Sequence, residues 1–391
     1  SRGLGDVYKR QGIKCILIVF VFNLSLLYFI MNILYVSCLL NNKATGLYWS
    51  VPRQIAAQAR YDHVFWYNIN HNSECEWQKI YPCHTIDEYP YLRLKDLPSP
   101  FNVPDLVIFE SFYEYAFSKL VYEIWRKNIP YIIVPRCSLT KEAQRIKHLK
   151  KRIGNFLFFS KFARKALAIQ YLTENEYVAS GDKWNGQHII IANGINTPGE
   201  IHRVFGSTLH GLFIGRIAVY HKGLDLLVDA CSKMQDELRQ AGCTIRLYGP
   251  DWDGDESKLR KRVQERGVAD IILPGNGPVY EDEKRNLLLR YDFFVLTSRL
   301  EGHPMALIEA LSYGLPALVT EGTNMATEVE KYNTGWGSAS TVDGIVASLR
   351  RLIKERDQLS LKSKNAILLS KQYDWNVLAG KASEKYRALL K

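Results

Sequence analysis

The chain has 391 residues, of which 47% are hydrophobic and 23% are charged, and its formal net charge is +11. This length accommodates two domains with complete cores, and the composition excludes a largely disordered chain. The seven scattered cysteines include no C-x-x-C pair, which favours free thiols in a reducing cytoplasm over a disulfide framework or a zinc site.

Residues 1–30 differ in character from the rest of the chain. Residues 1–11 show no periodicity, and an apolar run that begins at Cys15 leads directly into Met31. We interpret residues 1–30 as upstream read-through and Met31 as the natural start. The alternative is a membrane anchor, because Cys15–Leu40 carries no charged residue and exceeds the ~20 residues that a spanning helix requires. Such an anchor would consume the first strand of the fold.

From residue 31 to residue 200, apolar runs alternate with helical patterns. The runs are continuous rather than alternating, which is typical of a parallel sheet covered on both faces. The predicted strands are residues 32–40, 105–111, 129–135, 156–160 and 188–193. Helices are predicted over Ser50–Arg60 and Tyr113–Lys127. These patterns predict an N-terminal Rossmann-like domain over residues 31–200.

A Gly-, Pro- and Asn-rich stretch at Asn193–Arg203 predicts a linker, after which a second series begins. Its predicted strands are residues 209–216, 244–249, 270–275, 291–298 and 315–322. A last helix is predicted near Trp375–Leu390. The predicted fold class is therefore α/β, with a second doubly wound domain over residues 201–373 that faces the first across a cleft.

The segment Thr297–Gly314, TSRLEGHPMALIEALSYG, carries the strongest chemical signal. A strand ends, a loop carries Glu301, and a helix opens at Pro304 and stops at Gly314. The amides at the helix start favour a phosphate, and the predicted donors are Met305, Ala306 and Leu307. Glu309 leans back toward the same helix terminus. The two carboxylates would thus flank one diphosphate, where the ribose and the sugar of a nucleotide sugar carry hydroxyls.

Two cations are predicted beside the same cleft. The segment FIGRIAVYHKG places Arg216 at the end of a strand and Lys222 before a helix that begins near Gly223. Fixed positive charges there would neutralise a diphosphate leaving group as its charge develops. Either residue alone is typical of a surface charge, but together with the two glutamates they predict a donor site.

The pairing of G-R-x5-K-G with E-x7-E resembles the family 4 (group 1) glycosyltransferases, which have the GT-B fold. The resemblance extends over Met31–Leu390. It implies transfer from a nucleotide-diphosphate sugar as co-substrate, with retention of anomeric configuration and with neither a metal nor a bound cofactor. It also implies that a C-terminal helix, residues 374–391, crosses back to the first domain.

The resemblance also implies roles for individual residues. Arg216 and Lys222 match the residues that bind the donor diphosphate in the family. Glu309 matches the glutamate that holds the ribose, and Glu301 matches the one placed against the donor sugar. These four residues form the core of the predicted site.

Two departures from the family pattern affect the mechanism. The first loop carries Gly46 alone instead of a Gly-Gly pair, which still allows close backbone approach. Arg136 stands where the family often has a histidine, and an arginine cannot accept a proton at neutral pH. We therefore expect Arg136 to hold an acceptor phosphate or the leaving group, while the departing phosphate oxygen takes the acceptor proton. Further predicted donor contacts are His303, Pro304, Gly249 and Val279.

The segment Lys141–Lys165 contains nine basic residues against the single acid Glu142. It is either a solvated helix face or a contact with anionic lipid, to which each basic residue contributes about 1 kcal/mol. The lipid contact suits a lipid-linked acceptor at the inner face of the plasma membrane. Nucleic acid is not an expected partner, because the basic residues lack interleaved stacking aromatics.

The predicted function is transfer of a hexosyl-type sugar from a UDP- or GDP-linked donor to a glycan or lipid-linked acceptor, in bacterial cell-surface polysaccharide synthesis. A nicotinamide dehydrogenase is excluded because G-x-G-x-x-G is absent after both first strands. A phosphorylase or an epimerase with the same architecture stays open, as does a non-catalytic nucleotide-sugar-binding module of a membrane biosynthetic complex. Turnover distinguishes an enzyme from a binding module.

Overall fold

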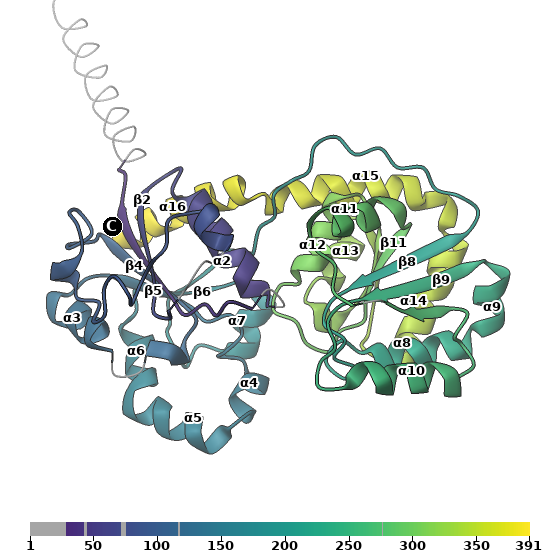
Figure 1. Cartoon of the computed structure of the whole chain (residues 1–391), viewed down its shortest axis with the longest axis horizontal. Coiled ribbons are helices and arrows are strands. Elements are labelled where there is room, and N and C mark those ends of the chain that lie inside the picture. The colour runs from purple at the N-terminus through teal and green to yellow at the C-terminus, as the bar shows by residue number, and fades with distance from the viewer. Residues whose placement is uncertain (1–28, 43–44, 72–75, 116–117, 276) are drawn as a thin grey trace, which may run out of the picture.

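The computed structural model describes residues 29–42, 45–71, 76–115, 118–275 and 277–391, which form two domains side by side (Figure 1). The two interpretations of residues 1–30 therefore concern a segment that lies, apart from Phe29 and Ile30, outside the described residues.

Within the described residues, the first domain is built on a seven-stranded sheet in the order β3-β2-β1-β4-β5-β6-β7, with every pairing parallel. The strands are β1 (Asn32–Ser37), β2 (His63–Asn68), β3 (His84–Thr85), β4 (Leu106–Glu110), β5 (Tyr131–Val134), β6 (Ala168–Tyr171) and β7 (His188–Ile190). Leu34 and Val36 pack into one core and Ile33 and Tyr35 into another. Both faces are thus buried, which explains the continuous apolar run.

Helices cover this sheet on both sides. The α-helices are α2 (Gly46–Gln58), α3 (Lys119–Lys127), α4 (Lys141–Arg145), α5 (His148–Gly154), α6 (Ser160–Lys165) and α7 (Glu174–Ser180). Shorter turns are η1 (Glu76–Lys79), η2 (Leu94–Asp96), η3 (Tyr113–Tyr115) and the π-helical turn η4 (Asn155–Phe159). The predicted helices correspond to α2 and to η3 with α3.

The predicted strand over residues 156–160 is wrong, because this segment is the π-helical turn η4 between α5 and α6. Phe158 and Phe159 are buried against the sheet, whereas Phe156 and Leu157 are exposed. A short continuous apolar run does not distinguish a strand from a helix. The strand at this place in the order is β6, which begins three residues after α6 ends.

The second domain repeats the architecture, with the described strands in the order β10-β9-β8-β11-β12-β13, again all parallel. The strands are β8 (Leu209–Ile214), β9 (Cys243–Tyr248), β10 (Ile272–Pro274), β11 (Phe293–Leu296), β12 (Ala317–Thr320) and β13 (Gly335–Ser338). Its helices and turns are α8 (Leu224–Lys233), α9 (Gln235–Gln240), α10 (Asp255–Glu265), α11 (Glu281–Arg290), α12 (Met305–Ser312), η5 (Glu321–Thr323), α13 (Ala326–Lys331), α14 (Val342–Lys354), η6 (Arg356–Gln358), α15 (Leu359–Ser370) and η7 (Lys371–Tyr373). The predicted α/β class with two doubly wound domains is confirmed.

The last helix, α16 (Trp375–Leu390), returns to the first domain as predicted (Figure 1). Trp375, Leu378 and Ala379 form a small core with Ala57 of α2. The buried Asp62 carboxylate accepts hydrogen bonds from the Ser383 hydroxyl and from Arg387 Nη2, the latter at 2.9 Å. Packing contacts and a buried charge pair thus hold α16, which follows the second domain in the chain, against the first domain.

Candidate active site

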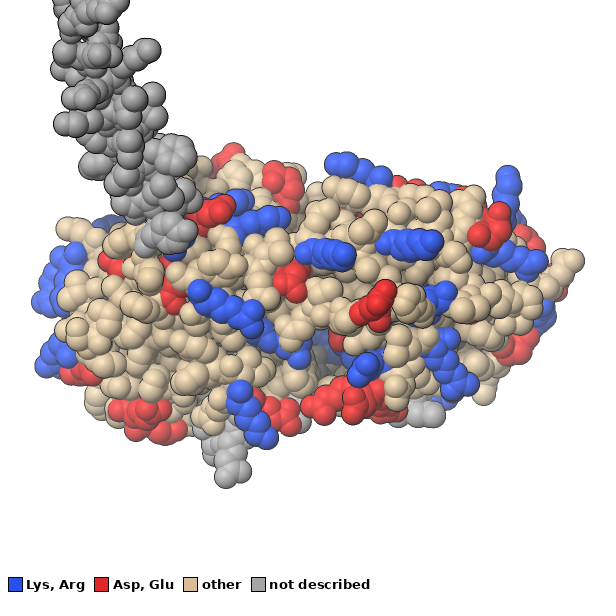
Figure 2. Space-filling model, turned by 90° about the horizontal axis from the view of Figure 1, so that it is seen from above, with Lys and Arg blue, Asp and Glu red and all other residues tan. Residues whose placement is uncertain are grey.

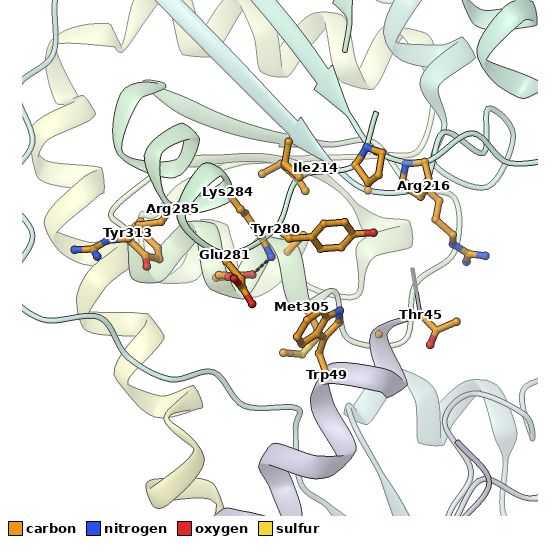
Figure 3. A pocket seen from close by; sticks show the side chains of 18 of the residues that line it. Thr45, Trp49, Ile214, Arg216, Tyr280, Glu281, Lys284, Arg285, Met305 and Tyr313 are labelled. Atoms are coloured by element: carbon orange, nitrogen blue, oxygen red, sulfur yellow. Dashed lines mark hydrogen bonds and ion pairs between the residues drawn. The ribbon is translucent and has the colours of Figure 1, made fainter. Parts of the chain in front are cut away.

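A pocket of about 250 Å³ lies between the two domains. The start of α2 brings Thr45 and Trp49 to one wall, and the second domain supplies the opposite wall with Tyr280 and Arg216 (Figure 3). The second-domain residues come from the carboxyl ends of parallel strands and the helices that follow, where ligands bind in this class of fold. Seven predicted site residues line the pocket, namely Gly46, Arg216, Gly249, Val279, Met305, Ala306 and Glu309.

Hydrogen bonds and a close backbone approach join the loop that carries Lys222 to the segment that leads to Glu301. Gly223 has φ +58°, and a Cβ at this position would lie 2.0 Å from the carbonyl oxygen of Thr297. The Thr297 hydroxyl donates to the carbonyl oxygens of Lys222 at 3.1 Å and Gly223 at 3.0 Å. Glycine after Lys222 is therefore required by this close approach.

Lys222 and Glu301 form an ion pair beside the pocket, with both side chains 16% exposed. Ser298 Oγ donates to the same carboxylate at 2.8 Å. The Glu301 amide donates to the carbonyl oxygen of Gly322 at 2.8 Å, which holds the loop in place. The pair lies next to the pocket wall, since a Cβ built on Gly215 would be 3.7 Å from Lys222 Cε.

A second ion pair lines the pocket itself. Glu309 on α12 is paired with Lys284 on the neighbouring helix α11, and the two side chains are 30% and 22% exposed. Lys284 was not predicted. Its 25-residue separation from Glu309 follows no motif, so only the packing of the two helices reveals the contact.

Arg216 extends from the end of β8 into the pocket wall. Its guanidinium lies over the ring of Trp252, 4.3 Å from the ring centroid. The cation–π contact with Trp252 restrains the guanidinium, and such a contact leaves guanidinium N–H groups able to bind an anion. This arrangement suits an anionic ligand.

The N-terminus of α12 offers fewer amides than predicted. The helix begins at Met305 after Pro304, within one residue of the expected start, and Gly314 follows its end with φ +72°. The Leu307 amide, however, donates to the Pro304 carbonyl oxygen at 3.1 Å, and the Leu307 side chain is fully buried. The expectation of a free Leu307 amide is therefore wrong, because the first turn closes on Pro304. Met305 and Ala306 line the pocket.

His303 does not line the pocket and is only 6% exposed. Its ring lies 5.1 Å from the ring of Tyr373, and within the described part of the chain its Nδ1 has no hydrogen-bond partner. Burial lowers the pKa of His303 to about 3, so the ring is neutral at physiological pH. The predicted contact of His303 with the donor sugar stays a prediction.

Arg136 also lies outside the pocket lining, within a buried polar network of the first domain. Its Nε and Nη2 each lie 2.9 Å from Glu110 Oε2, Nη2 donates to Gln54 Oε1 at 2.8 Å, and Nη1 donates to Asn193 Oδ1 at 2.5 Å. The Arg136 side chain is 7% exposed and that of Glu110 only 1%. The guanidinium thus binds its own domain, and its predicted contact with a phosphate stays a prediction.

The turn at Arg136 and Cys137 nevertheless approaches the second-domain loop that carries Glu301. Arg136 and Cys137 are consecutive left-handed residues, with φ of 51° and 67°. The Cys137 amide donates to Glu176 Oε1 at 2.5 Å, which holds the turn. A Cβ on Gly302 would lie 2.5 Å from Cys137 Sγ, so the two domains touch beside Glu301.

Trp49, Tyr280 and Arg53 also line the pocket and were not predicted from the sequence. Trp49 and Tyr280 face each other across the domains with ring centroids 6.4 Å apart, and Arg53 lies 5.4 Å from the Trp49 ring centroid. The i, i+4 spacing of Trp49 and Arg53 was the available signal, since it places both on one face of α2. Nothing in the sequence indicated that this face meets the second domain.

Cys38, Cys137, Cys231 and Cys243 are free thiols. Among the described residues no group of three His, Cys, Asp or Glu side chains is arranged to hold a metal ion. Cys75 lies outside the described residues.

Comparison with known proteins gives a family match for the second domain. The family model for glycosyl transferases group 1 matches residues 207–368, which run from the start of the second domain into α15. The chain carries a group 1 glycosyltransferase domain. The predicted family resemblance is thereby confirmed for the domain that holds both ion pairs.

Relatives of this glycosyltransferase domain agree with the family match. The GDP-mannose:cellobiosyl-diphosphopolyprenol alpha-mannosyltransferase of Xanthomonas oryzae is 27% identical over 212 residues, which cover 51% of this chain and 53% of that protein. The mannosylfructose-phosphate synthase of Agrobacterium fabrum is 33% identical over 113 residues, or 28% of this chain and 24% of that protein. The chain thus spans about half the length, or less, of these curated relatives.

Solved glycosyltransferases share the fold of both domains, over 90% or more of this chain. HepE of Anabaena, in complex with UDP, superposes with a TM-score of 0.69 at 14% identity and covers 92% of this chain and all of its own. The lipopolysaccharide glycosyltransferase WaaG superposes with a TM-score of 0.59 at 16% identity, over 90% of this chain and 99% of its own. The predicted GT-B fold is confirmed.

Proposed function

We propose that this protein is a retaining glycosyltransferase that transfers a hexosyl-type sugar from a UDP- or GDP-linked donor. The observation that carries the proposal is the pocket between the domains, in which Arg216 and the ion pair Lys284–Glu309 line the wall and the ion pair Lys222–Glu301 lies beside it. We expect the diphosphate to bind beside Arg216 and Lys222. The carboxylates of Glu301 and Glu309 would then lie on either side of it.

Each ion pair has a second function once the donor binds. A diphosphate near Lys222 competes with Glu301 for the ammonium group, since phosphate oxygens are strong acceptors for charged donors. Glu301 is then available to accept hydrogen bonds from sugar hydroxyls, and Glu309 from the ribose. Ligand-free pairing keeps all four charges compensated at low desolvation cost, because each side chain retains 16–30% exposure.

The proposed reaction breaks the bond between the anomeric carbon and the diphosphate oxygen. Arg216 and Lys222 stabilise the negative charge that develops on that oxygen, and this charge stabilisation requires neither a metal nor a cofactor. The acceptor oxygen attacks on the same face and gives its proton to the departing phosphate oxygen, which conserves the anomeric configuration. No side-chain base at Arg136 is needed.

The proposed acceptor is a glycan or a lipid-linked intermediate of cell-surface polysaccharide synthesis. The mannosyltransferase relative acts on a diphosphopolyprenol acceptor by its name, and the basic segment Lys141–Lys165 suits an anionic membrane surface. No helix within the described ranges is long and apolar enough to cross a bilayer. We place the protein in the cytoplasm at the inner face of the plasma membrane, in peripheral contact with lipid.

The first test is a thermal-shift screen of the full chain against UDP, GDP, ADP and their common sugar conjugates. A ligand that binds only the folded state raises the melting temperature. We expect one nucleotide to stabilise the protein, and Arg216→Ala to abolish the shift. The matched control is Arg356→Ala, an exposed residue outside the pocket, which should keep it. Absence of a shift with every nucleotide at millimolar concentration would overturn the donor site.

A non-catalytic nucleotide-sugar-binding module is the second candidate, because the charged pocket residues Arg216, Lys284 and Glu309 would hold a nucleotide sugar whether or not turnover follows. Release of the free nucleotide in the presence of a lipid-linked acceptor separates the two. Binding without any release under those conditions would favour the module.

A further inference from the structure

Trp252 stands in the loop between β9 and α10, beside the arginine that extends into the pocket wall. Its ring is 49% exposed, and the Arg216 guanidinium lies 4.3 Å from the ring centroid. Tryptophan is highly buried on average, so core packing does not explain a half-exposed ring at this position. The contact with Arg216 is the interaction that gives this side chain a defined place in the molecule.

The backbone of the β9–α10 loop is fixed against the end of β8. The Ile217 amide donates to the Pro250 carbonyl oxygen at 2.9 Å, and the Trp252 amide donates to the Ile217 carbonyl oxygen at 3.3 Å. A Cβ on Gly249 would lie 1.7 Å from the carbonyl oxygen of Gly215, so the two backbones meet directly. The fold thus sets where the tryptophan side chain begins relative to β8 before any ligand binds.

The Arg216 guanidinium is held differently from the two lysines of the site. Lys222 pairs with Glu301, and Lys284 pairs with Glu309. Such compensation is common on this molecule, since acidic and basic side chains are interspersed on the face seen from above, over α15 and α16 (Figure 2). Within the described ranges, no carboxylate pairs with the Arg216 guanidinium. An aromatic face stands where the lysines have a carboxylate.

Arg299 contacts an aromatic ring in the same way but differs in its hydrogen bonds. Its guanidinium lies 4.5 Å from the Tyr220 ring centroid. Its Nη1 and Nη2 donate to the two carboxylate oxygens of Asp225 at 2.7 and 2.8 Å, and Nη1 also donates to the Tyr220 carbonyl oxygen at 2.7 Å. The terminal nitrogens of Arg299 are thus occupied, whereas no described residue occupies those of Arg216.

A ring in place of a carboxylate changes what the binding of an anion requires. An aromatic face restrains a guanidinium without using its N–H donors. A side chain that is already restrained loses less rotamer freedom when the anion binds, so more of the interaction free energy appears as affinity. A carboxylate would also restrain the guanidinium, but the diphosphate would first have to displace it.

We propose that Trp252 is a positioning residue that holds the Arg216 guanidinium ready for the diphosphate of the donor. The ligand class is a nucleoside diphosphate or its sugar conjugate, and Trp252 acts on it through Arg216, without touching it. This inference rests on the proposed function and adds the β9–α10 loop to the donor site.

The test is isothermal titration calorimetry of the full chain with UDP and with GDP. For the nucleotide that binds the wild type, Trp252→Leu should lower the affinity by about 3–10-fold, because the cation–π contact and the restraint on Arg216 are lost. Trp252→Phe keeps an aromatic face and should recover most of the affinity. The matched control Tyr220→Leu removes the ring beside Arg299, whose terminal nitrogens are already occupied, and should leave the affinity unchanged.

A second background separates positioning from a general effect on the loop. Arg216→Lys keeps a charge but has no planar guanidinium for the ring to hold, so adding Trp252→Leu to it should change the affinity by less than about twofold. An equal loss in the wild-type and Arg216→Lys backgrounds overturns the inference.

Inorganic pyrophosphate, measured by competition with the nucleotide, presents the diphosphate alone. Its affinity should fall in Trp252→Leu by the same factor as that of the nucleotide. An unchanged pyrophosphate affinity would show that Trp252 contacts the nucleoside directly, and this also overturns the inference.

The same measurements separate failure of this inference from failure of the donor site on which it rests. If neither nucleotide binds the wild type, the donor site and the inference are overturned together. If a nucleotide binds the wild type and Trp252→Leu equally well, the inference alone is overturned.

Discussion

The two domains place charged residues at equivalent sheet edges but use them differently. In the first domain, Arg136 and Glu110 are 7% and 1% exposed and bind each other within a buried network. In the second, Lys222–Glu301 and Lys284–Glu309 remain partly exposed at a pocket. Residue type and strand position therefore do not decide whether a charged side chain can bind a ligand. The number of groups of the protein that already pair with the charge decides it.

The largest expected effect breaks the buried pair of the first domain. Glu110→Ala leaves Arg136 charged and without its carboxylate, and we expect the free energy of unfolding to fall by about 3–5 kcal/mol. Urea unfolding measures this. The control is Asp343→Ala, whose side chain is 87% exposed and pairs with Lys233, and it should cost less than about 1 kcal/mol. Equal stability of both variants would contradict the structural role of Arg136.

For Glu301 in the second domain, we expect a large effect on turnover and a small effect on stability. Glu301→Gln should lower turnover by about 10²–10³, because a charge aimed at the reacting sugar is lost, while stability changes by less than about 1 kcal/mol. Steady-state kinetics and urea unfolding measure the two quantities. Glu321→Gln, an exposed glutamate 20 residues further along, is the matched control. A loss of stability without a loss of turnover would show that Glu301, like Glu110, stabilises the fold and does not contribute to the reaction.

Glu309 should affect donor binding more moderately. Removing its charge with Glu309→Gln weakens a charge-assisted hydrogen bond worth about 1.5–3 kcal/mol, so nucleotide affinity should fall about 10–100-fold. Isothermal titration calorimetry gives the affinity. The same change at Glu283, exposed on α11, should have no effect. Unchanged affinity in Glu309→Gln would remove the ribose contact from the proposal.

His303 tests a buried group inside the second domain. The folded-state pKa of about 3 lies below the unfolded value of about 6.5, so below pH 6.5 the unfolded chain binds a proton that the folded chain does not. Stability is lost as pH falls, by about 1.4 kcal/mol per pH unit. Between pH 7 and pH 5, the wild type should lose about 2 kcal/mol more than His303→Phe. His202→Phe, at an 85% exposed histidine, should follow the wild type, and parallel curves for all three would contradict a buried neutral His303.

The sequence predicted the fold more completely than the site. Continuous apolar runs indicated two parallel sheets, and Pro304 and Gly314 located both ends of α12. Residues 156–160 were misassigned because an apolar run fits a strand and a helix equally well. In the site, Arg216 and Glu309 were predicted because a motif links them to strand and helix ends. Lys284 was not, since its partner depends on how two helices pack.

The sequence by itself determined the alternation of strands and helices, the glycine at position 223 and the two glutamates eight residues apart, because these depend on local backbone geometry and spacing. Only the tertiary structure decided that Arg136 is enclosed by Glu110, Gln54 and Asn193. It also decided that Phe156 is exposed and Phe158 buried. The physical reason is that burial and charge compensation depend on contacts between segments far apart in the chain, which no local pattern encodes.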